Sequence, residues 1–97
     1  MDQSVFSQRF AVVDTETTGL DPSNCRMLQL GIVIARGDGT IESEFSTYVD
    51  QPIPGFGKLG AHDIHGITRR DLRGGLPVGI AIDHLNWALR GARLDRK

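Results

Sequence analysis

A short apolar run near the start of the chain, Phe10-Ala11-Val12-Val13, constrains the fold more than any other feature. It is too short for a helix, and an unbroken run of this kind is typical of a strand buried on both faces. Further along, residues 77–91 have the length and spacing of a long amphipathic helix. A single long helix covers only one face of a sheet. The sequence therefore predicts a strand whose second face is covered either by another chain or by further parts of a larger domain.

Two further stretches predict strands beside this one. Met27 to Ala35 is a second apolar run, and it is followed by the turn sequence Gly37-Asp38-Gly39. Ile41 to Val49 then alternates as a half-buried strand does, with Glu44 on one face and Ile41 on the other. An Asp-Gly pair between two such stretches is a strong hairpin signal. We expect antiparallel neighbours in chain order.

The second half of the chain predicts loops and helices. Prolines and glycines between Asp50 and Gly60 exclude regular structure there. Residues 61–65 predict a short helical turn, and Thr68 is a suitable N-cap for a second turn over Arg69 to Leu72. Pro77 is expected as the first residue of the long helix. The apolar face of that helix is marked by residues three and four positions apart: Val78, Ala81, Ile82, Leu85, Ala88 and Leu89.

The long helix and the residues after it carry three more expectations. Trp87 flanks the apolar face and is expected to pack against the sheet, because aromatic side chains contribute strongly to cores. His84 lies on the polar side and is expected to be solvated. The basic tail from Arg90 to Lys97 is expected to be a frayed terminus in which Asp95 is solvated.

Composition limits the partners of the chain. Its 97 residues fit one small domain, residues 1–97, and 11 Lys+Arg against 12 Asp+Glu exclude a protein that binds nucleic acid through a broad basic surface. The single cysteine, Cys25, excludes an internal disulfide and favours a reducing compartment. The sequence shows no signal-peptide pattern and no apolar stretch near the ~20 residues of a membrane span. We therefore expect a cytoplasmic protein with no membrane partner.

Two carboxylates, Asp14 and Glu16, directly follow the first apolar run. Residues i and i+2 of an extended chain project from one face, so both carboxylates point the same way and repel each other unless a cation or a proton neutralises them. Oxygen ligands suit Mg²⁺ or Mn²⁺ rather than zinc or copper. Such an ion activates water and stabilises the leaving oxygen of a phosphodiester. The alternatives are a solvated turn and a haloacid-dehalogenase-like phosphatase, which has a second Asp where this chain has Glu16.

The residues around this pair resemble the first motif of the DEDD (DnaQ-like) 3′–5′ exonucleases. The motif is Val12-Val13-Asp14-Thr15-Glu16-Thr17-Thr18-Gly19-Leu20-Asp21-Pro22, and the resemblance continues through Met27 to Val33, Phe45 to Val49, and Ile64-His65-Gly66-Ile67-Thr68. It covers most of residues 9–91. The resemblance is closest to the proofreading (epsilon) subunits of bacterial DNA polymerase III.

The resemblance implies a ribonuclease H-like α/β fold and hydrolysis of nucleotides from a 3′ end with two Mg²⁺ or Mn²⁺ ions. It assigns Asp14 and Glu16 as catalytic metal ligands. It places Thr17 and Leu20 beside the terminal nucleotide, and His65 in contact with the substrate. The partners that it implies are the 3′ end of a single-stranded nucleic acid and a DNA polymerase subunit.

Parts of the family pattern do not occur in the sequence. The family has four acidic ligands and a histidine base, whereas this chain supplies Asp14 and Glu16. The second acidic motif should follow the long helix, where the chain reads Arg90 to Lys97. Gln29 stands where many relatives have Glu, and Gly60 where the proofreading subunit has an acid.

We therefore expect the N-terminal half of a ribonuclease H-like domain: three antiparallel strands, short helices and one long helix. Two carboxylates hold a hydrated Mg²⁺ weakly, so we expect weak or no catalysis by this chain alone. Three alternatives stay open. The chain is a pseudo-exonuclease that binds a polymerase or single-stranded ends, or it is a non-functional gene fragment, or a homodimer covers the open face of the sheet.

Overall fold

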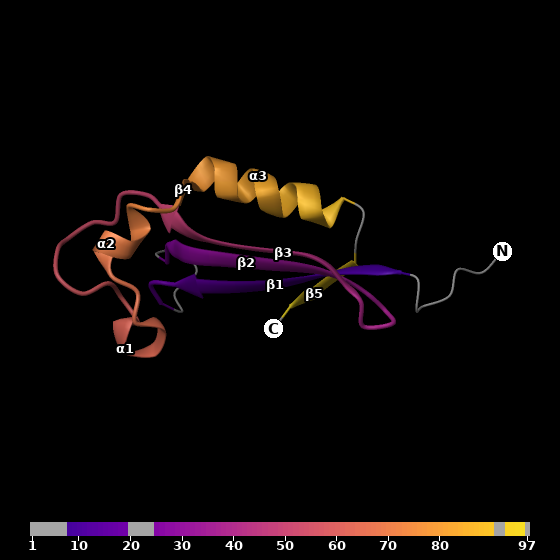
Figure 1. Ribbon diagram of the computed structural model, residues 1–97. Helices are drawn as coiled ribbons and strands as arrows, with labels where there is room; N and C mark the ends of the chain where they lie inside the picture. The colour runs from indigo at the N-terminus through magenta and orange to yellow at the C-terminus, as the bar shows by residue number, and fades with distance from the viewer. Residues whose placement is uncertain (1–7, 20–24, 91–92, 97) are drawn as a thin grey trace.

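The computed structural model describes residues 8–19, 25–90 and 93–96, the last of these as backbone. The elements, in chain order, are β1 (Arg9–Thr17), β2 (Met27–Arg36), β3 (Ile41–Asp50), α1 (His62–His65), α2 (Arg69–Leu72), β4 (Leu76–Pro77), α3 (Val78–Leu89) and β5 (Arg93–Arg96). The strands form a sheet in the order β4-β3-β2-β1-β5 (Figure 1). The predicted antiparallel strands, short helices and single long helix are confirmed. Among the helices described, none has the length and apolar character needed to cross a bilayer.

The β2–β3 hairpin turns at the predicted Asp38-Gly39 pair. Gly39 has a φ of 92°, which favours glycine, and its N–H donates to the Arg36 carbonyl at 2.9 Å. The Asp38 carboxylate accepts a 2.9 Å hydrogen bond from the backbone N–H of Thr40. This hydrogen bond, chiefly, holds the pKa of Asp38 below its usual value. The turn thus fixes the register of the two strands locally.

A bulge near the hairpin changes which residues of β3 share a face. The register shifts between Ile34 and Ala35, and Ala35 pairs with Ile41, which leaves Glu42 as the extra residue of β3. As a result, Ile41 lines the same groove as Glu44. The prediction that these two side chains face opposite sides is wrong, because strict alternation does not continue through a bulge.

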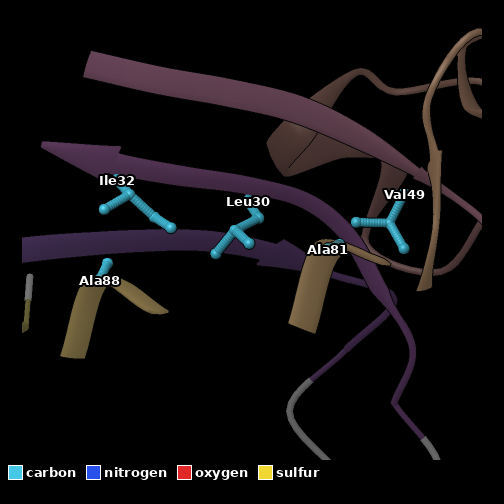
Figure 2. Close-up of a cluster of buried hydrophobic side chains, with 5 residues drawn as sticks. All are labelled: Leu30, Ile32, Val49, Ala81 and Ala88. Carbon is cyan, nitrogen blue, oxygen red and sulfur yellow. The ribbon is translucent and has the colours of Figure 1, made fainter. Parts of the chain in front are cut away.

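The long helix α3 covers one face of the sheet, across β2 and β3 (Figure 1). Figure 2 shows the main core between them, which contains Leu30, Ile32, Val49, Ala81 and Ala88. The two alanines lie seven residues apart on α3, and their small side chains let the helix approach the sheet. A second buried cluster, Leu28, Leu59, Ile67 and Leu72, lies at the end of the sheet near α2.

The two short helices form where the sequence predicts them. Thr68 is the N-cap of α2, and its hydroxyl accepts a hydrogen bond from the backbone N–H of Asp71 at 3.3 Å. The Asp71 carboxylate in turn accepts from the backbone N–H of Thr68 at 2.9 Å, which completes a capping box. The left-handed Ala61 and Gly66 bound α1 on either side.

The helix α3 departs from two predictions. Trp87 is 73% exposed and does not pack against the sheet, and Ile82 is 42% exposed. Each follows or precedes an alanine of the core by one residue, which rotates it by about 100° away from the sheet. His84 is exposed, but its ring stacks on that of Phe45, with centroids 4.4 Å apart. Its exposure agrees with the prediction, although Phe45 stacks on one face of the ring.

The ends of α3 also differ from the predictions. Pro77 belongs to β4 and caps the helix, which begins one residue later at Val78. Residues Arg93–Arg96 form β5, which pairs in parallel with residues 10–13 of β1. The expectation of a frayed tail is wrong over this segment, because the edge of β1 offers backbone N–H and C=O groups for pairing. The predicted end of the helix at Gly91 lies outside the described residues.

Candidate functional site

The carboxylates of Asp14 and Glu16 line one shallow pocket on the sheet face opposite α3. Val13 packs against the core on the α3 side of the sheet. Because alternate residues of a strand project to opposite faces, Asp14 and Glu16 project to the other side. In the register, Asp14 pairs with Gly31 and Glu16 with Gln29. The pocket is lined by Asp14, Glu16, Gln29, Gly31 and Ser46.

The floor of this pocket is open because of Gly31. The register places Gly31 between Asp14 on β1 and Ser46 on β3. A side chain there would occupy the space between the carboxylate and the hydroxyl. The amide of Gln29 and the hydroxyl of Ser46 add uncharged oxygen donors to the two carboxylates. Sequence reasoning missed Gly31 and Ser46. Counting pairs back from the hairpin turn would place Phe45 opposite Gly31, and only the bulge beside Ala35 shifts the pairing to Ser46.

The charge of the pocket is unbalanced among the described residues. Asp14 is exposed and Glu16 is half-buried. The ion pairs among the described residues join Glu42 to Arg9 and Arg36, away from this pocket, and do not involve these two acids. The described residues do not bring three His, Cys, Asp or Glu side chains together. Two neighbouring carboxylates with no cation favour the binding of a hard divalent ion. The donor set is therefore compatible with Mg²⁺ or Mn²⁺ but provides only part of a ligand shell.

Beside the pocket, the same sheet face is apolar and open. A groove of about 550 Å³ runs along it, and its lining includes Val12, Val33, Ala35 and Ile41 as well as Asp14. No residue of the described helices lines this groove, and Figure 1 shows α3 on the other face of the sheet. The prediction that one helix leaves the second face of β1 without cover is thus confirmed for the described part of the chain.

The end of β1 is shaped by local hydrogen bonds. The Thr17 hydroxyl donates to the Gly19 carbonyl at 2.8 Å. Thr18 donates its backbone N–H to the Arg26 carbonyl at 3.0 Å, and its hydroxyl accepts from the Arg26 N–H at 2.9 Å. These bonds fix the conformation of Thr17 and Thr18, which directly follow Glu16 in the chain. Leu20, the other residue predicted beside the terminal nucleotide, lies outside the described residues.

His65 is the last residue of α1, and both of its ring nitrogens form hydrogen bonds. Nδ1 accepts a 2.8 Å hydrogen bond from the Ile67 N–H, so Nε2 carries the proton and donates to the Gly60 carbonyl at 2.8 Å. Gly60 itself lies against β1, since a Cβ there would be 2.1 Å from the Thr18 carbonyl oxygen. His65 therefore holds the loop against the strand that carries the acids. A substrate contact by His65 stays a prediction.

Comparison with known proteins identifies the family. A model of the RNase T exonuclease family matches residues 11–96, and the chain belongs to this exonuclease family. The resemblance to the DEDD exonucleases is thereby confirmed at the level of the family. No curated protein sequence matches the chain.

Solved structures show the same fold. E. coli exonuclease I, in complex with a dT13 oligonucleotide, matches with a TM-score of 0.76 and 17% identity over 93% of this chain and 20% of its own. The nuclease domain of 3′hExo, a DEDDh family member bound to rAMP, gives a TM-score of 0.64 and 18% identity over 97% of this chain and 52% of its own. Cell-death related nuclease 4 (CRN-4) matches with a TM-score of 0.62 and 22% identity, over 87% of this chain and 30% of its own.

These comparisons establish the fold as part of a ribonuclease H-like α/β exonuclease domain. The identities are all 22% or lower, so they show the fold and not the activity. The chain spans between 20% and 52% of the length of these three solved chains. It therefore corresponds to one part of those larger molecules.

Proposed function

We propose that this chain carries the first-motif part of a metal-dependent 3′–5′ exonuclease site. The observation that supports it is the pair Asp14 and Glu16, which share one pocket on a chain of the exonuclease family. In this proposal both carboxylates ligate Mg²⁺ or Mn²⁺. Bound there, a divalent ion lowers the pKa of a water and stabilises charge on a phosphodiester.

The residues around the carboxylates take supporting roles in the proposed site. Gln29 and Ser46 flank Glu16 and Asp14, and their amide and hydroxyl groups orient water or a phosphate oxygen in the pocket. Thr17 and Leu20 lie beside the terminal nucleotide, and His65 contacts the substrate or holds the loop that does. In this proposal, the other acidic metal ligands and the general base are supplied by residues other than those named here.

The proposed substrate is the 3′ end of a single-stranded nucleic acid. Two matching structures support this choice, since one holds a dT13 oligonucleotide and another holds rAMP. The finer proposal is a proofreading exonuclease of the epsilon type that acts beside a DNA polymerase subunit in the cytoplasm. It rests on the first motif and on the Ile64-His65-Gly66-Ile67-Thr68 element.

A second candidate function is binding without cleavage. It is favoured by one observation: the described residues gather two acidic side chains and no cluster of three metal ligands. Such a chain would bind single-stranded ends or a polymerase and leave the phosphodiester intact. A second copy that covers the apolar groove is compatible with this function.

Metal binding and cleavage separate the two candidates. Mn²⁺ binding is measured by electron paramagnetic resonance on the wild type, on Asp14→Asn and on Glu16→Gln, with Glu44→Gln on the same sheet face as the control. We expect Asp14→Asn and Glu16→Gln, and not Glu44→Gln, to weaken Mn²⁺ binding by about tenfold or more.

A 5′-labelled single-stranded oligonucleotide then tests cleavage with Mg²⁺ or Mn²⁺. Shortening from the 3′ end that both site variants abolish supports the exonuclease. Mn²⁺ binding without shortening supports the binding module. Wild-type Mn²⁺ binding no tighter than that of the two variants contradicts the metal site itself.

A further inference from the structure

The loop between β3 and α1 presents an aromatic side chain to solvent. Phe56 is 95% exposed, the highest exposure among the large apolar residues described. It lies between Gly55, with a φ of 87°, and Gly57, with a φ of 83°. Left-handed glycines on both sides of Phe56 bend the backbone sharply there, and the phenyl ring is exposed at this bend. Water contact of a whole phenyl ring is unfavourable, so a ring held there is available for a contact.

This loop is held in place by one arginine. The guanidinium of Arg69, at the start of α2, donates to three backbone carbonyls of the loop: Ile53 at 2.8 Å, Gly57 at 3.0 Å and Pro54 at 3.3 Å. The bonds span both sides of Phe56. An arginine fork with several acceptors fixes a loop more firmly than a single bond. The exposed ring is therefore presented on a tethered loop.

The hollow beneath the ring is basic. It is lined by Thr18, Arg26, Ile53, Pro54, Gly55, Phe56, Lys58, Gly60 and Arg69, which include three cations and no carboxylate. The whole chain, by contrast, carries a formal net charge of −1. Within the described ranges, neither Arg26 nor Lys58 forms an ion pair. A local excess of positive charge beside an aromatic ring suits a ligand with phosphates and bases.

The hollow adjoins the candidate site at the end of β1. Thr18 lines it and follows Glu16 by two residues, which is about 7 Å along a strand. Gly60, also in the lining, contacts Thr18 so closely that a Cβ would meet its carbonyl oxygen at 2.1 Å. The basic hollow thus lies at the end of β1 that carries the two acids.

We propose that Phe56, Arg26 and Lys58 form a second subsite, which binds the nucleotides upstream of the 3′ end in a single-stranded polynucleotide. Phe56 stacks on a base, and the two cations contact backbone phosphates. The inference deepens the proposed function, because it assumes that the 3′ end lies at Asp14 and Glu16. A single strand fits better than a duplex, because its unstacked bases are free to meet an exposed ring.

The experiment measures binding in EDTA, so that neither metal binding nor cleavage contributes. Fluorescence anisotropy follows a labelled oligothymidylate or oligouridylate on the full chain. We expect Phe56→Ala to weaken oligonucleotide binding by about fivefold or more. Trp87→Ala, at the other exposed aromatic ring, is the matched control and should have no effect.

The charge component is tested through salt. Each phosphate contact on a single strand contributes about 0.7 to the slope of log affinity against log salt concentration. Arg26→Gln and Lys58→Gln should each lower the slope by about that amount, and Arg90→Gln on α3 should not. Circular dichroism confirms that the variants are folded.

The outcomes separate this subsite from the catalytic proposal. Unchanged binding in Phe56→Ala, or an equal loss in Trp87→Ala, overturns the subsite. Loss of binding in the loop variants supports it even where no cleavage is seen, because the assay contains no metal. A preference between oligothymidylate and oligouridylate identifies the substrate as DNA or RNA.

Discussion

The two faces of the sheet differ in what they contribute: one stabilises the fold and the other carries the candidate site. The face under α3 is closed and apolar, with Leu30, Val49 and Ala81 fully buried. The opposite face holds Asp14 and Glu16 in one pocket and an apolar groove beside it. Both faces are made by the same three strands, so the difference lies only in which alternate residues point each way.

This difference shows how a small sheet combines stability with chemistry. Apolar core residues lie on the face that the helix covers, and the two acids lie on the face that is open to solvent. The following predictions, from the largest effect to the smallest, test this division.

Truncation of the covered face should cost most. Leu30→Ala removes a fully buried side chain from the core in Figure 2 and should lower the free energy of unfolding by about 2–5 kcal/mol. Val33→Ala on the open face should cost about 1 kcal/mol or less, since its side chain is only half-buried. Urea denaturation followed by circular dichroism compares the two. Equal losses would show that both faces are buried in solution.

Addition of a methyl group should separate a packed glycine from an open one. In Gly60→Ala the new Cβ would lie 2.1 Å from the Thr18 carbonyl oxygen, so we expect a loss of about 1–3 kcal/mol in the free energy of unfolding. In Gly31→Ala the nearest atom is 3.7 Å away, and stability should change little. Gly31→Ala should nevertheless weaken Mn²⁺ binding, because it fills the floor of the pocket. Thermal denaturation and Mn²⁺ titration test both variants.

Removal of charge from the open face should not destabilise the fold. The double variant Asp14→Asn, Glu16→Gln relieves the repulsion between two neighbouring carboxylates and should raise the free energy of unfolding by up to about 1 kcal/mol. Mn²⁺ should raise the melting temperature of the wild type but not that of the double variant. A double variant that unfolds more readily than the wild type would mean that the carboxylates are structural.

The smallest effect concerns the ion pairs at the hairpin end of the sheet. Glu42 contacts Arg9 and Arg36 at 2.7 Å each. Partial burial alone would raise the pKa of Glu42, but the hydrogen bonds and charges of Arg36 and Arg9 outweigh it and lower the pKa below 4.5. A carboxyl whose pKa is lower in the folded chain stabilises the fold above its unfolded pKa, and this stabilisation is lost as the pH falls through the folded pKa.

Glu42→Gln should therefore flatten the pH dependence of the melting temperature below about pH 4.5. Near neutral pH, the slope of the melting temperature against pH should not change. Glu44→Gln, which replaces an exposed acid of the same strand, is the control. Melting curves collected across this acid range give the comparison. An identical acid profile for Glu42→Gln and the wild type would contradict the role of the ion pairs.

Local patterns in the sequence were sufficient where neighbours in the chain decide the structure. Residues a few positions apart determine three features: the Asp38-Gly39 turn, the Thr68 cap, and the projection of Asp14 and Glu16 from one face. Predictions failed where distant segments meet. Trp87 faces solvent because its neighbour Ala88 is the residue of α3 that packs against the sheet. The strand β5 formed because the edge of β1 offers backbone groups for pairing.

The candidate site shows the same limit. The motif predicted both carboxylates, but Gly31 and Ser46 join them only through strand pairing. The hydrogen bonds of His65 to Gly60 and Ile67 depend on the folded loop, and no spacing in the sequence indicates them. Phe56 is unremarkable among the prolines and glycines around it until Arg69 is seen to tether its loop.

The pairing of Asp14 with Gly31 has a consequence for how the chain reaches one structure. If β1 slipped by one residue along β2, Asp14 and Glu16 would enter the core beneath α3, and Val13 would face water. Burial of two like charges without partners costs far more than the pairing gained by such a slip. The acids that define the candidate site thus also exclude misregistered sheets, and natural replacement of them by neutral residues would weaken fold specificity along with metal binding.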